Sequence, residues 1–166
     1  MKKITEILDT VLKHALIVLM AALVTAVSWQ VISRYVFASP SSWTEEVARF
    51  LLIWIGVLGA AYAFRTGVHL GLDVLPKKLT GMPATVLKMF TVLVVMIFSV
   101  LVLMIGGGSL VMLTWELKQY SAVLGLPIAF VYSVIPISGA LISFYAIALA
   151  MGEEVPDSED LVQPGS

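Results

Sequence analysis

The sequence has no cysteine in its 166 residues and only two histidines, His14 and His69. The absence of cysteine excludes disulfide bonds, thiolate metal sites and cysteine nucleophiles. Two histidines leave little with which to build a metal site or a general base, so no cofactor is expected in this chain. The formal net charge is −1, and without a large basic surface nothing indicates nucleic-acid binding.

Charged residues are also scarce: they make up 13% of the chain, whereas 60% is hydrophobic and the mean hydropathy is +1.00. A soluble domain typically has about 25% charged and about 45–50% apolar residues. A transmembrane helix needs roughly 20 mostly apolar residues, and four stretches qualify, at about residues 15–33, 47–64, 89–115 and 127–151. The sequence therefore predicts an all-α membrane protein in which residues 1–152 form a single domain of four transmembrane helices.

The two ends of the chain differ from this apolar centre. The leader is too mixed in charge for a cleaved signal peptide. Its apolar residues recur at helical spacing, which predicts a short amphipathic helix lying at the membrane interface; they are Ile4, Ile7, Leu8, Val11 and Leu12. Residues 153–166 are acidic and include two prolines, so this tail is expected to be disordered.

The distribution of lysine and arginine predicts the orientation in the membrane. The segments on the same side as the N-terminus hold seven of these residues, and those on the other side hold three. Cytoplasmic loops are enriched in Lys and Arg. Both termini are therefore expected in the cytoplasm.

No Asp, Glu, Lys or Arg lies in the middle of a predicted span. An ionisable residue costs about 2.5–3.5 kcal/mol at a helix centre, so it is kept there for a function such as proton or ion coupling. Its absence argues against a self-contained small transporter of the four-helix multidrug type. It also argues against a membrane enzyme, because no nucleophile, base and acid converge. A transport site made of backbone carbonyls stays open.

The densest polar segment includes the sequence SSWTEEVAR, which ends at Arg49. Ser42 and Glu45 have the spacing of a capping box. Glu46 would share the first helical turn with Glu45, where the helix dipole favours negative charge, and Arg49 can pair with either glutamate. Trp43 fits an interfacial anchor. Two interpretations stay open: a well-capped helix start at the membrane surface, or a charged collar that docks a partner protein.

Small residues share one face of the second predicted helix with Arg49, and these are Gly56, Ala60, Ala63 and Gly67. Such a face lets another helix approach closely, and that helix can belong to this chain or to a separate membrane subunit. The glycines and serine at residues 106–109 predict a kink or a close contact in the third span rather than a ligand site. Pro136 predicts a kink in the fourth.

Three polar residues follow the second span at four-residue spacing: Arg65, His69 and Asp73. On a helix they would share one face, with a row of apolar residues on another. His69 and Asp73 are too few ligands for a metal site. A salt-bridged cap or a contact with a partner subunit is the preferred interpretation.

Several of these features recur together between Arg34 and Pro76. This stretch contains an Arg-Tyr-Val-Phe run, a Pro-x-x-Trp-Thr-Glu-Glu motif followed by Ala-Arg, a Leu-Gly-Ala-Ala stretch and a Gly-x-His-x-x-x-Asp segment. The combination resembles the small membrane subunit of tripartite ATP-independent periplasmic (TRAP) transporters, the DctQ-type family. The rest of the chain matches that family in length and in its four-span layout.

The resemblance implies a non-catalytic subunit of a sodium-coupled importer of an organic acid, such as sialic acid or a dicarboxylate, in a bacterial or archaeal inner membrane. A large membrane subunit (M type) would hold the substrate and sodium sites, and a periplasmic substrate-binding protein (P type) would deliver the substrate. The small subunit would scaffold the former and help dock the latter within the lipid bilayer. The residues expected to contact partners are Arg34, Trp43, Glu45, Glu46, Arg49, Gly56, Ala60, Arg65, His69 and Asp73.

Two alternatives remain beside this interpretation. One is an autonomous small four-helix transporter acting as a homo-oligomer. The other, weaker one is an anchoring subunit of a different membrane complex.

Overall fold

The computed structural model describes residues 2–37, 39, 41–66 and 82–151. These residues form helices and contain no β-strand; in order they are α1 (Lys2–Tyr35), α2 (Ser42–Arg65), α3 (Met82–Phe98), the π-helix η2 (Ser99–Gly106), α4 (Gly107–Glu116), α5 (Ile128–Tyr132) and α6 (Val134–Ala150). Four helical stretches are long and apolar enough to cross a membrane: Lys3–Tyr35, Ser42–Arg65, Met89–Glu116 and Ile128–Ala150. The predicted all-α membrane protein with four membrane helices is confirmed.

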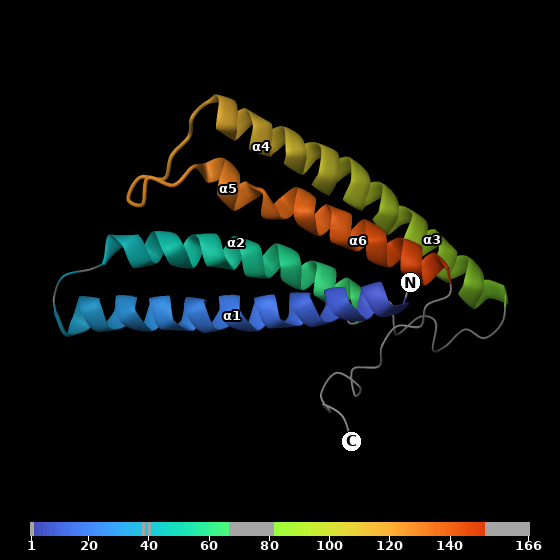
Figure 1. Ribbon diagram of the computed structural model, residues 1–166, viewed down its shortest axis with the longest axis horizontal. Helices are drawn as coiled ribbons and strands as arrows, with labels where there is room; N and C mark the ends of the chain where they lie inside the picture. Colours follow the sequence, from blue (N-terminus) through green and yellow to red (C-terminus); the bar gives the residue numbers. More distant parts are fainter. Residues whose placement is uncertain (1, 38, 40, 67–81, 152–166) are drawn as a thin grey trace, which may run out of the picture.

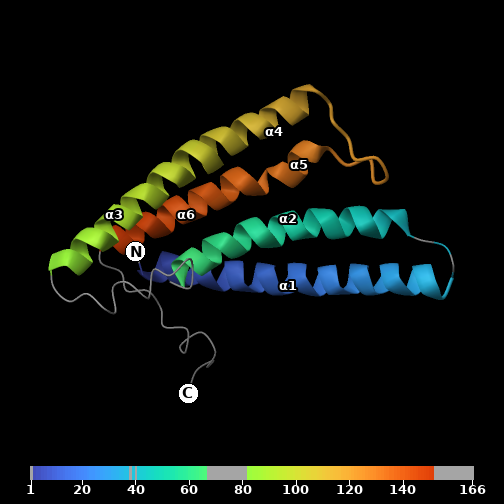
Figure 2. The same cartoon turned by 180° about the vertical axis from the view of Figure 1, so that it is seen from behind.

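The four membrane helices lie side by side in one layer, which Figures 1 and 2 show from opposite sides. At one edge α1 packs against α2, and α2 in turn packs against α6. At the other edge α3, η2 and α4 pack against α5 and α6. The connections between α1 and α2 and between α4 and α5 lie at one end of the layer, which we call the loop end (Figure 1). The start of α1 and the end of α6 lie at the opposite end, which we call the terminal end (Figure 1).

Burial is concentrated on the two middle helices of this layer. The most buried of the four membrane helices is the fourth, and α1 at the edge is the least buried. The core cluster consists of Leu12, Leu58, Ala61, Phe64, Val92, Val134, Ile142, Tyr145 and Ala146. The outer sides of the edge helices expose many Val, Ile and Leu side chains, a surface suited to lipid rather than water.

The first helix differs from the sequence-based expectation at its start. α1 runs without a break from Lys2 through 34 residues, so the amphipathic N-terminal segment is not a separate helix but the first turns of α1. At about 1.5 Å per residue this helix is about 51 Å long, whereas a bilayer core is about 30 Å thick. The first turns of α1 therefore extend beyond the apolar core of a membrane that the helix crosses upright.

The start of α2 also differs from the sequence-based prediction, because the capping box of Ser42 and Glu45 is not formed. The N-cap residue is Ser41, one position earlier, and its side chain makes no capping hydrogen bond. The hydroxyl of Thr44 instead donates to the Ser41 carbonyl at 2.8 Å. Ser41 and Ser42 are adjacent and chemically identical, so the sequence alone could not decide between them.

The third and fourth membrane helices approach each other at two glycines. A Cβ atom at Gly107 would lie only 2.7 Å from Cγ2 of Ile135, and one at Gly139 would lie 2.8 Å from Cβ of Leu103. Both positions therefore require glycine for the observed distance between the helices. The close contact predicted within residues 106–109 is confirmed, and it involves Gly107.

The fourth membrane helix is interrupted at Ser133, between α5 and α6. Pro136 has no N–H to donate to the carbonyl of Tyr132, four residues earlier, and its ring would clash with that carbonyl in a regular helix. The interruption lies where this hydrogen bond is missing. The predicted proline distortion is thus present as a break in the helix.

Candidate functional site

The loop end carries an exposed ion pair on the first turns of α2. Nη2 of Arg49 lies 3.2 Å from Oε1 of Glu45, and the two side chains are 66% and 61% exposed. A pair of this kind on one helix contributes only about 0.3–0.5 kcal/mol. Both charges therefore remain available to a partner at little cost to the fold.

Aromatic side chains are also exposed at the loop end. Three of the four tryptophans are exposed there: Trp29, Trp43 and Trp115. The ring of Trp29 lies 6.3 Å from that of Phe37, and the exposed Arg34 lies 5.9 Å from the ring of Tyr35. Tryptophan and tyrosine are enriched where a membrane meets water, so the loop end has the composition of a membrane interface.

Glu46 has a different role from its neighbour Glu45. Its carboxylate accepts three backbone hydrogen bonds from consecutive residues of the connection between α4 and α5, from the N–H groups of Ala122 (3.1 Å), Val123 (3.1 Å) and Leu124 (2.8 Å). Charge-assisted bonds from backbone N–H groups to a carboxylate are stronger than neutral ones. Glu46 therefore fastens this connection to the start of α2.

The fastened connection is itself a small folded unit, which we call the outer hairpin, residues 119–128. Tyr120 and Pro127 form an antiparallel bridge, and Gly125 turns the chain with φ +65°, a value that favours glycine. Two further backbone bonds close it, from Ser121 N–H to the Leu126 carbonyl at 2.8 Å and from Ile128 N–H to the Gln119 carbonyl at 2.9 Å. The hairpin presents exposed Tyr120, Val123 and Leu126 at the loop end.

Both glutamates were predicted to contact partners, and the bond network of Glu46 was not predicted. The signal that separates them is helical periodicity. Glu46 is about 20° from Val57 around the helix axis, and Val57 packs against the core. Glu45 is about 20° from Gly56, which is exposed. Periodicity therefore predicts Glu46 inward and Glu45 outward, although not the segment that Glu46 meets.

The small-residue face of α2 leaves space at Gly56 that the described part of this chain does not fill, and the neighbouring Gly59 has similar space. A Cβ atom added at Gly56 or at Gly59 would meet no atom within 4 Å, whereas Ala60 is half-buried. These glycines are therefore not required by contacts among the described helices. Gly67, the last residue of the predicted face, lies outside the described residues.

At the terminal end, Arg65 pairs with a residue of the leader. Its Nε donates to Oδ2 of Asp9 at 3.1 Å, and the two side chains are only 9% and 15% exposed. Arg65 was expected among the partner contacts, and its pairing with Asp9, which lies 56 residues away, was not predicted. His69 and Asp73 lie outside the described residues. Among the described residues, no group of three His, Asp or Glu could hold a metal ion.

The middle of the layer uses hydroxyl and indole groups instead of charges. Ser138 donates to the carbonyl of Val57 at 2.8 Å, and Nε1 of Trp54 donates to the carbonyl of Val131 at 3.1 Å. The hydroxyls of Ser99 and Ser143 lie 2.8 Å apart. Each of these bonds joins two helices, so the polar groups stabilise packing rather than line a path for a solute.

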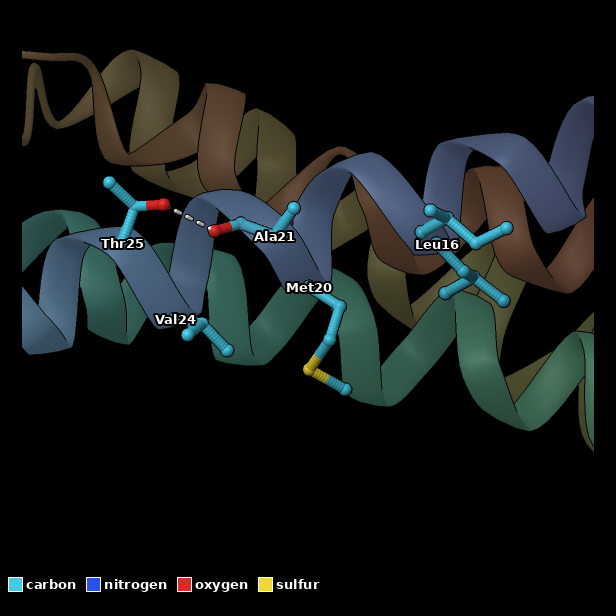
Figure 3. Close-up of a pocket in the computed structure, with 6 residues that line it drawn as sticks. Leu16, Met20, Ala21, Val24 and Thr25 are labelled. Atoms are coloured by element: carbon cyan, nitrogen blue, oxygen red, sulfur yellow. Dashed lines mark hydrogen bonds between the residues drawn. The ribbon is translucent and has the colours of Figure 1, made fainter.

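A shallow open depression lies on the outer side of α1 (Figure 3), and all six of its lining residues belong to that one helix: Leu16, Ile17, Met20, Ala21, Val24 and Thr25. The only side-chain hydroxyl there, on Thr25, donates to the Ala21 carbonyl at 2.8 Å. No polar side chain therefore points into the depression to orient a solute. It has the character of a lipid-facing helix surface.

Comparison with known families supports this picture of a structural membrane subunit. The family described as "Tripartite ATP-independent periplasmic transporters, DctQ component" matches residues 10–153. The match covers all four membrane helices except the first turns of α1.

Three individual relatives are small permease proteins. One from Haemophilus influenzae, described as a TRAP transporter small permease protein, is 31% identical over 143 residues, which is 86% of this chain and 87% of the relative. The sialic acid TRAP transporter small permease protein SiaQ of Vibrio cholerae is 32% identical over 82 residues, 47% of each protein. The C4-dicarboxylate TRAP transporter small permease protein DctQ of Rhodobacter capsulatus is 32% identical over 120 residues, 66% of this chain and 48% of the relative.

Proposed function

This chain belongs to the DctQ component family of tripartite ATP-independent periplasmic transporters, and we propose that it is the small membrane subunit of a sodium-coupled importer of an organic acid. Family membership makes it a non-catalytic transporter subunit and not an enzyme. In this proposal it scaffolds the large membrane subunit and helps to dock the periplasmic substrate-binding protein. The relatives named for sialic acid and for C4-dicarboxylates support a substrate that carries a carboxylate.

One observation carries the division of labour between the subunits. In the described residues the middle of every membrane helix is free of Asp, Glu, Lys and Arg, and the polar groups that are present bind neighbouring helices. Moving sodium or an organic anion requires groups that compensate charge inside the membrane. A chain without them is suited to holding a partner that moves, so we assign the substrate and sodium sites to the large subunit.

Reconstitution in liposomes tests this assignment. We expect no uptake of a labelled organic acid by this chain alone, and sodium-dependent uptake when the large subunit and the substrate-binding protein are added. Collapsing the sodium gradient should abolish that uptake. If the purified chain alone transports the acid, the alternative of an autonomous homo-oligomeric transporter is correct instead.

The loop end is the proposed docking region for the substrate-binding protein. The exposed Glu45–Arg49 pair offers charges at little cost to the fold, and the outer hairpin beside it is held in place by Glu46. The double change Glu45→Arg with Arg49→Glu retains an ion pair on α2 but exchanges the positions of the two charges. We expect the exchange to raise the concentration of binding protein needed for half-maximal uptake, while the large subunit still co-purifies.

A matched control is the change Glu6→Lys, which alters an exposed charge at the terminal end. It should leave the dependence on binding protein unchanged. Equal effects of the loop-end exchange and of Glu6→Lys would contradict docking at the loop end.

Both termini are proposed to lie in the cytoplasm, so that the loop end faces the periplasm. The excess of Lys and Arg on the terminal side supports this orientation. A reporter that is active only in the cytoplasm, fused after Ser166, should be active, whereas one inserted at residue 38 in the connection between α1 and α2 should be silent. The reverse pattern would place the docking region on the wrong side of the membrane.

A further inference from the structure

Most backbone donors of the outer hairpin, residues 119–128, are satisfied within the chain. Its ten residues include Pro127 and therefore carry nine backbone N–H groups. Seven of the nine donate to acceptors in this chain, three of them to Glu46 and four to backbone carbonyls. The latter four are the N–H groups of Gln119, Ser121, Gly125 and Ile128. A loop in water does not need these acceptors, because water accepts the hydrogen bonds that the loop leaves open.

The side chains of the outer hairpin are also poorly suited to water. No Asp, Glu, Lys or Arg occurs from Gln119 to Gly152, and the hairpin exposes Tyr120, Val123 and Leu126. An exposed apolar surface on an element with few open donors favours surroundings that offer few acceptors. Lipid provides such surroundings. A protein partner brings its own polar groups, since an interface holds about one hydrogen bond per 100–200 Å².

The depth of the outer hairpin agrees with a lipid contact. The hairpin lies beside the start of α2 (Figure 1) and is bonded there to Glu46, whereas the uncharged part of α2 begins at Phe50. Four residues of helix rise about 6 Å, and the headgroup layer is roughly 5–7 Å thick on each side of the apolar core. In a membrane that α2 crosses upright, the bonded residues therefore lie at the level of the headgroups, where tyrosine and tryptophan are enriched.

We propose that the outer hairpin is a lipid-binding element, whose exposed side chains enter the boundary between headgroups and acyl chains at the loop end. Glu46 makes this contact possible, because its carboxylate accepts hydrogen bonds from three N–H groups that acyl chains could not satisfy. The exposed pair of Glu45 and Arg49 is then the part of the loop end left to face a protein. The lipid contact is a property of this chain and does not depend on its proposed role in transport.

The absence of cysteine allows a single fluorescent label to be attached at Val123→Cys. The full chain, purified with any subunits that co-purify, is reconstituted in phosphatidylcholine vesicles. Two quenchers report the surroundings of the label: phosphatidylcholine brominated near the headgroup end of an acyl chain, and iodide in the water. We expect the brominated lipid to remove most of the fluorescence and iodide to remove little of it. Leu126→Cys, labelled in the same way, should give the same result.

Glu45→Cys is the matched control, because Glu45 is exposed at the same end of the layer. Iodide should quench a label there more strongly than the brominated lipid does. If iodide is also the stronger quencher at Val123→Cys or Leu126→Cys, the hairpin lies in water. If neither quencher acts at these two positions, a protein covers the hairpin. Either result overturns the proposal.

Glu46→Ala tests the part played by the carboxylate. It leaves three N–H groups without their acceptor, which is costly where water is scarce. In this background, quenching of the label at Val123→Cys should shift from lipid to iodide, whereas Glu45→Ala should leave it unchanged. A label at Ile17→Cys, exposed on the outer side of α1, should stay quenched by lipid and shows that the chain is still inserted. Equal lipid quenching at Val123→Cys in the Glu46→Ala and Glu45→Ala backgrounds would refute the role of Glu46 in the proposal.

Discussion

The contact between the third and fourth membrane helices can be tested by adding a single methyl group. In Gly107→Ala the new Cβ would lie 2.7 Å from Cγ2 of Ile135, and it would also lie 3.2 Å from Cβ of Ile135 and from Cδ of Pro136. The last two atoms belong to a branch point and to a ring, which have little freedom to retreat. The two helices must therefore move apart, or Ile135 must leave its position.

The size of the effect follows from two opposing terms. Replacing glycine with alanine inside a helix gains about 1 kcal/mol, because glycine loses more backbone freedom on folding. Overpacking costs about 1–3 kcal/mol. The adjacent change Gly108→Ala provides the control, since its Cβ would meet nothing within 4 Å and only the gain applies. The free energy of unfolding of Gly107→Ala should therefore be about 1–3 kcal/mol lower than that of Gly108→Ala. This is roughly a 5- to 150-fold difference in the unfolding equilibrium.

Unfolding of the purified chain in mixed micelles, driven by increasing sodium dodecyl sulfate and followed by tryptophan fluorescence, measures this difference. Gly107→Ala should unfold at a lower detergent fraction than Gly108→Ala. Gly139→Ala, whose Cβ would meet the backbone nitrogen of Met104 at 3.0 Å, should behave like Gly107→Ala. If Gly107→Ala and Gly108→Ala unfold together, the two helices are not held at the observed distance.

Two further predictions concern single hydrogen-bonding side chains. Glu46→Gln should speed hydrogen exchange at the amides of residues 122–124, because the side chain that accepts their hydrogen bonds loses its negative charge. Glu45→Gln is the control, and equal exchange rates at these amides in both variants would contradict the role of Glu46. Ser138→Ala should destabilise the chain by about 0.6 kcal/mol and by no more than about 1.7 kcal/mol, the range for hydrogen bonds between membrane helices. Ser109→Ala is its control in the same unfolding assay, since the Ser109 hydroxyl donates to the carbonyl of Ile105, four residues earlier in the same membrane helix. An equal loss of stability in both variants would rule out a specific role for the hydrogen bond from Ser138 to α2.

The number of membrane helices could be predicted because hydropathy over about 20 residues is a local property of the chain. Local signals were less decisive at helix ends. The apolar spacing of Ile4, Ile7 and Val11 fits an interfacial helix and also fits the first turns of a long continuous one. The two adjacent serines at 41 and 42 gave no basis for choosing the N-cap residue.

Long-range partners could not be predicted for a different reason. The bonds of Glu46 cross 76 to 78 residues, and the pair of Asp9 and Arg65 crosses 56. Charge and spacing show that each residue needs a partner near a membrane surface. Many pairings satisfy that need equally well, so only the arrangement of the helices selects one of them.

Glycines show most directly what hydropathy leaves undetermined in a membrane protein. Lipid and protein interior are similarly apolar, so an apolar helix face does not reveal which of them it meets. Gly107 and Gly139 lie where helices of this chain touch, whereas a Cβ atom added at Gly56 or Gly59 would meet no described atom within 4 Å. A glycine in a membrane helix thus marks a place that another helix can approach closely, and the fold decides whether that helix belongs to the same chain. The space at Gly56 is therefore compatible with the prediction that a helix of another subunit contacts this face of α2.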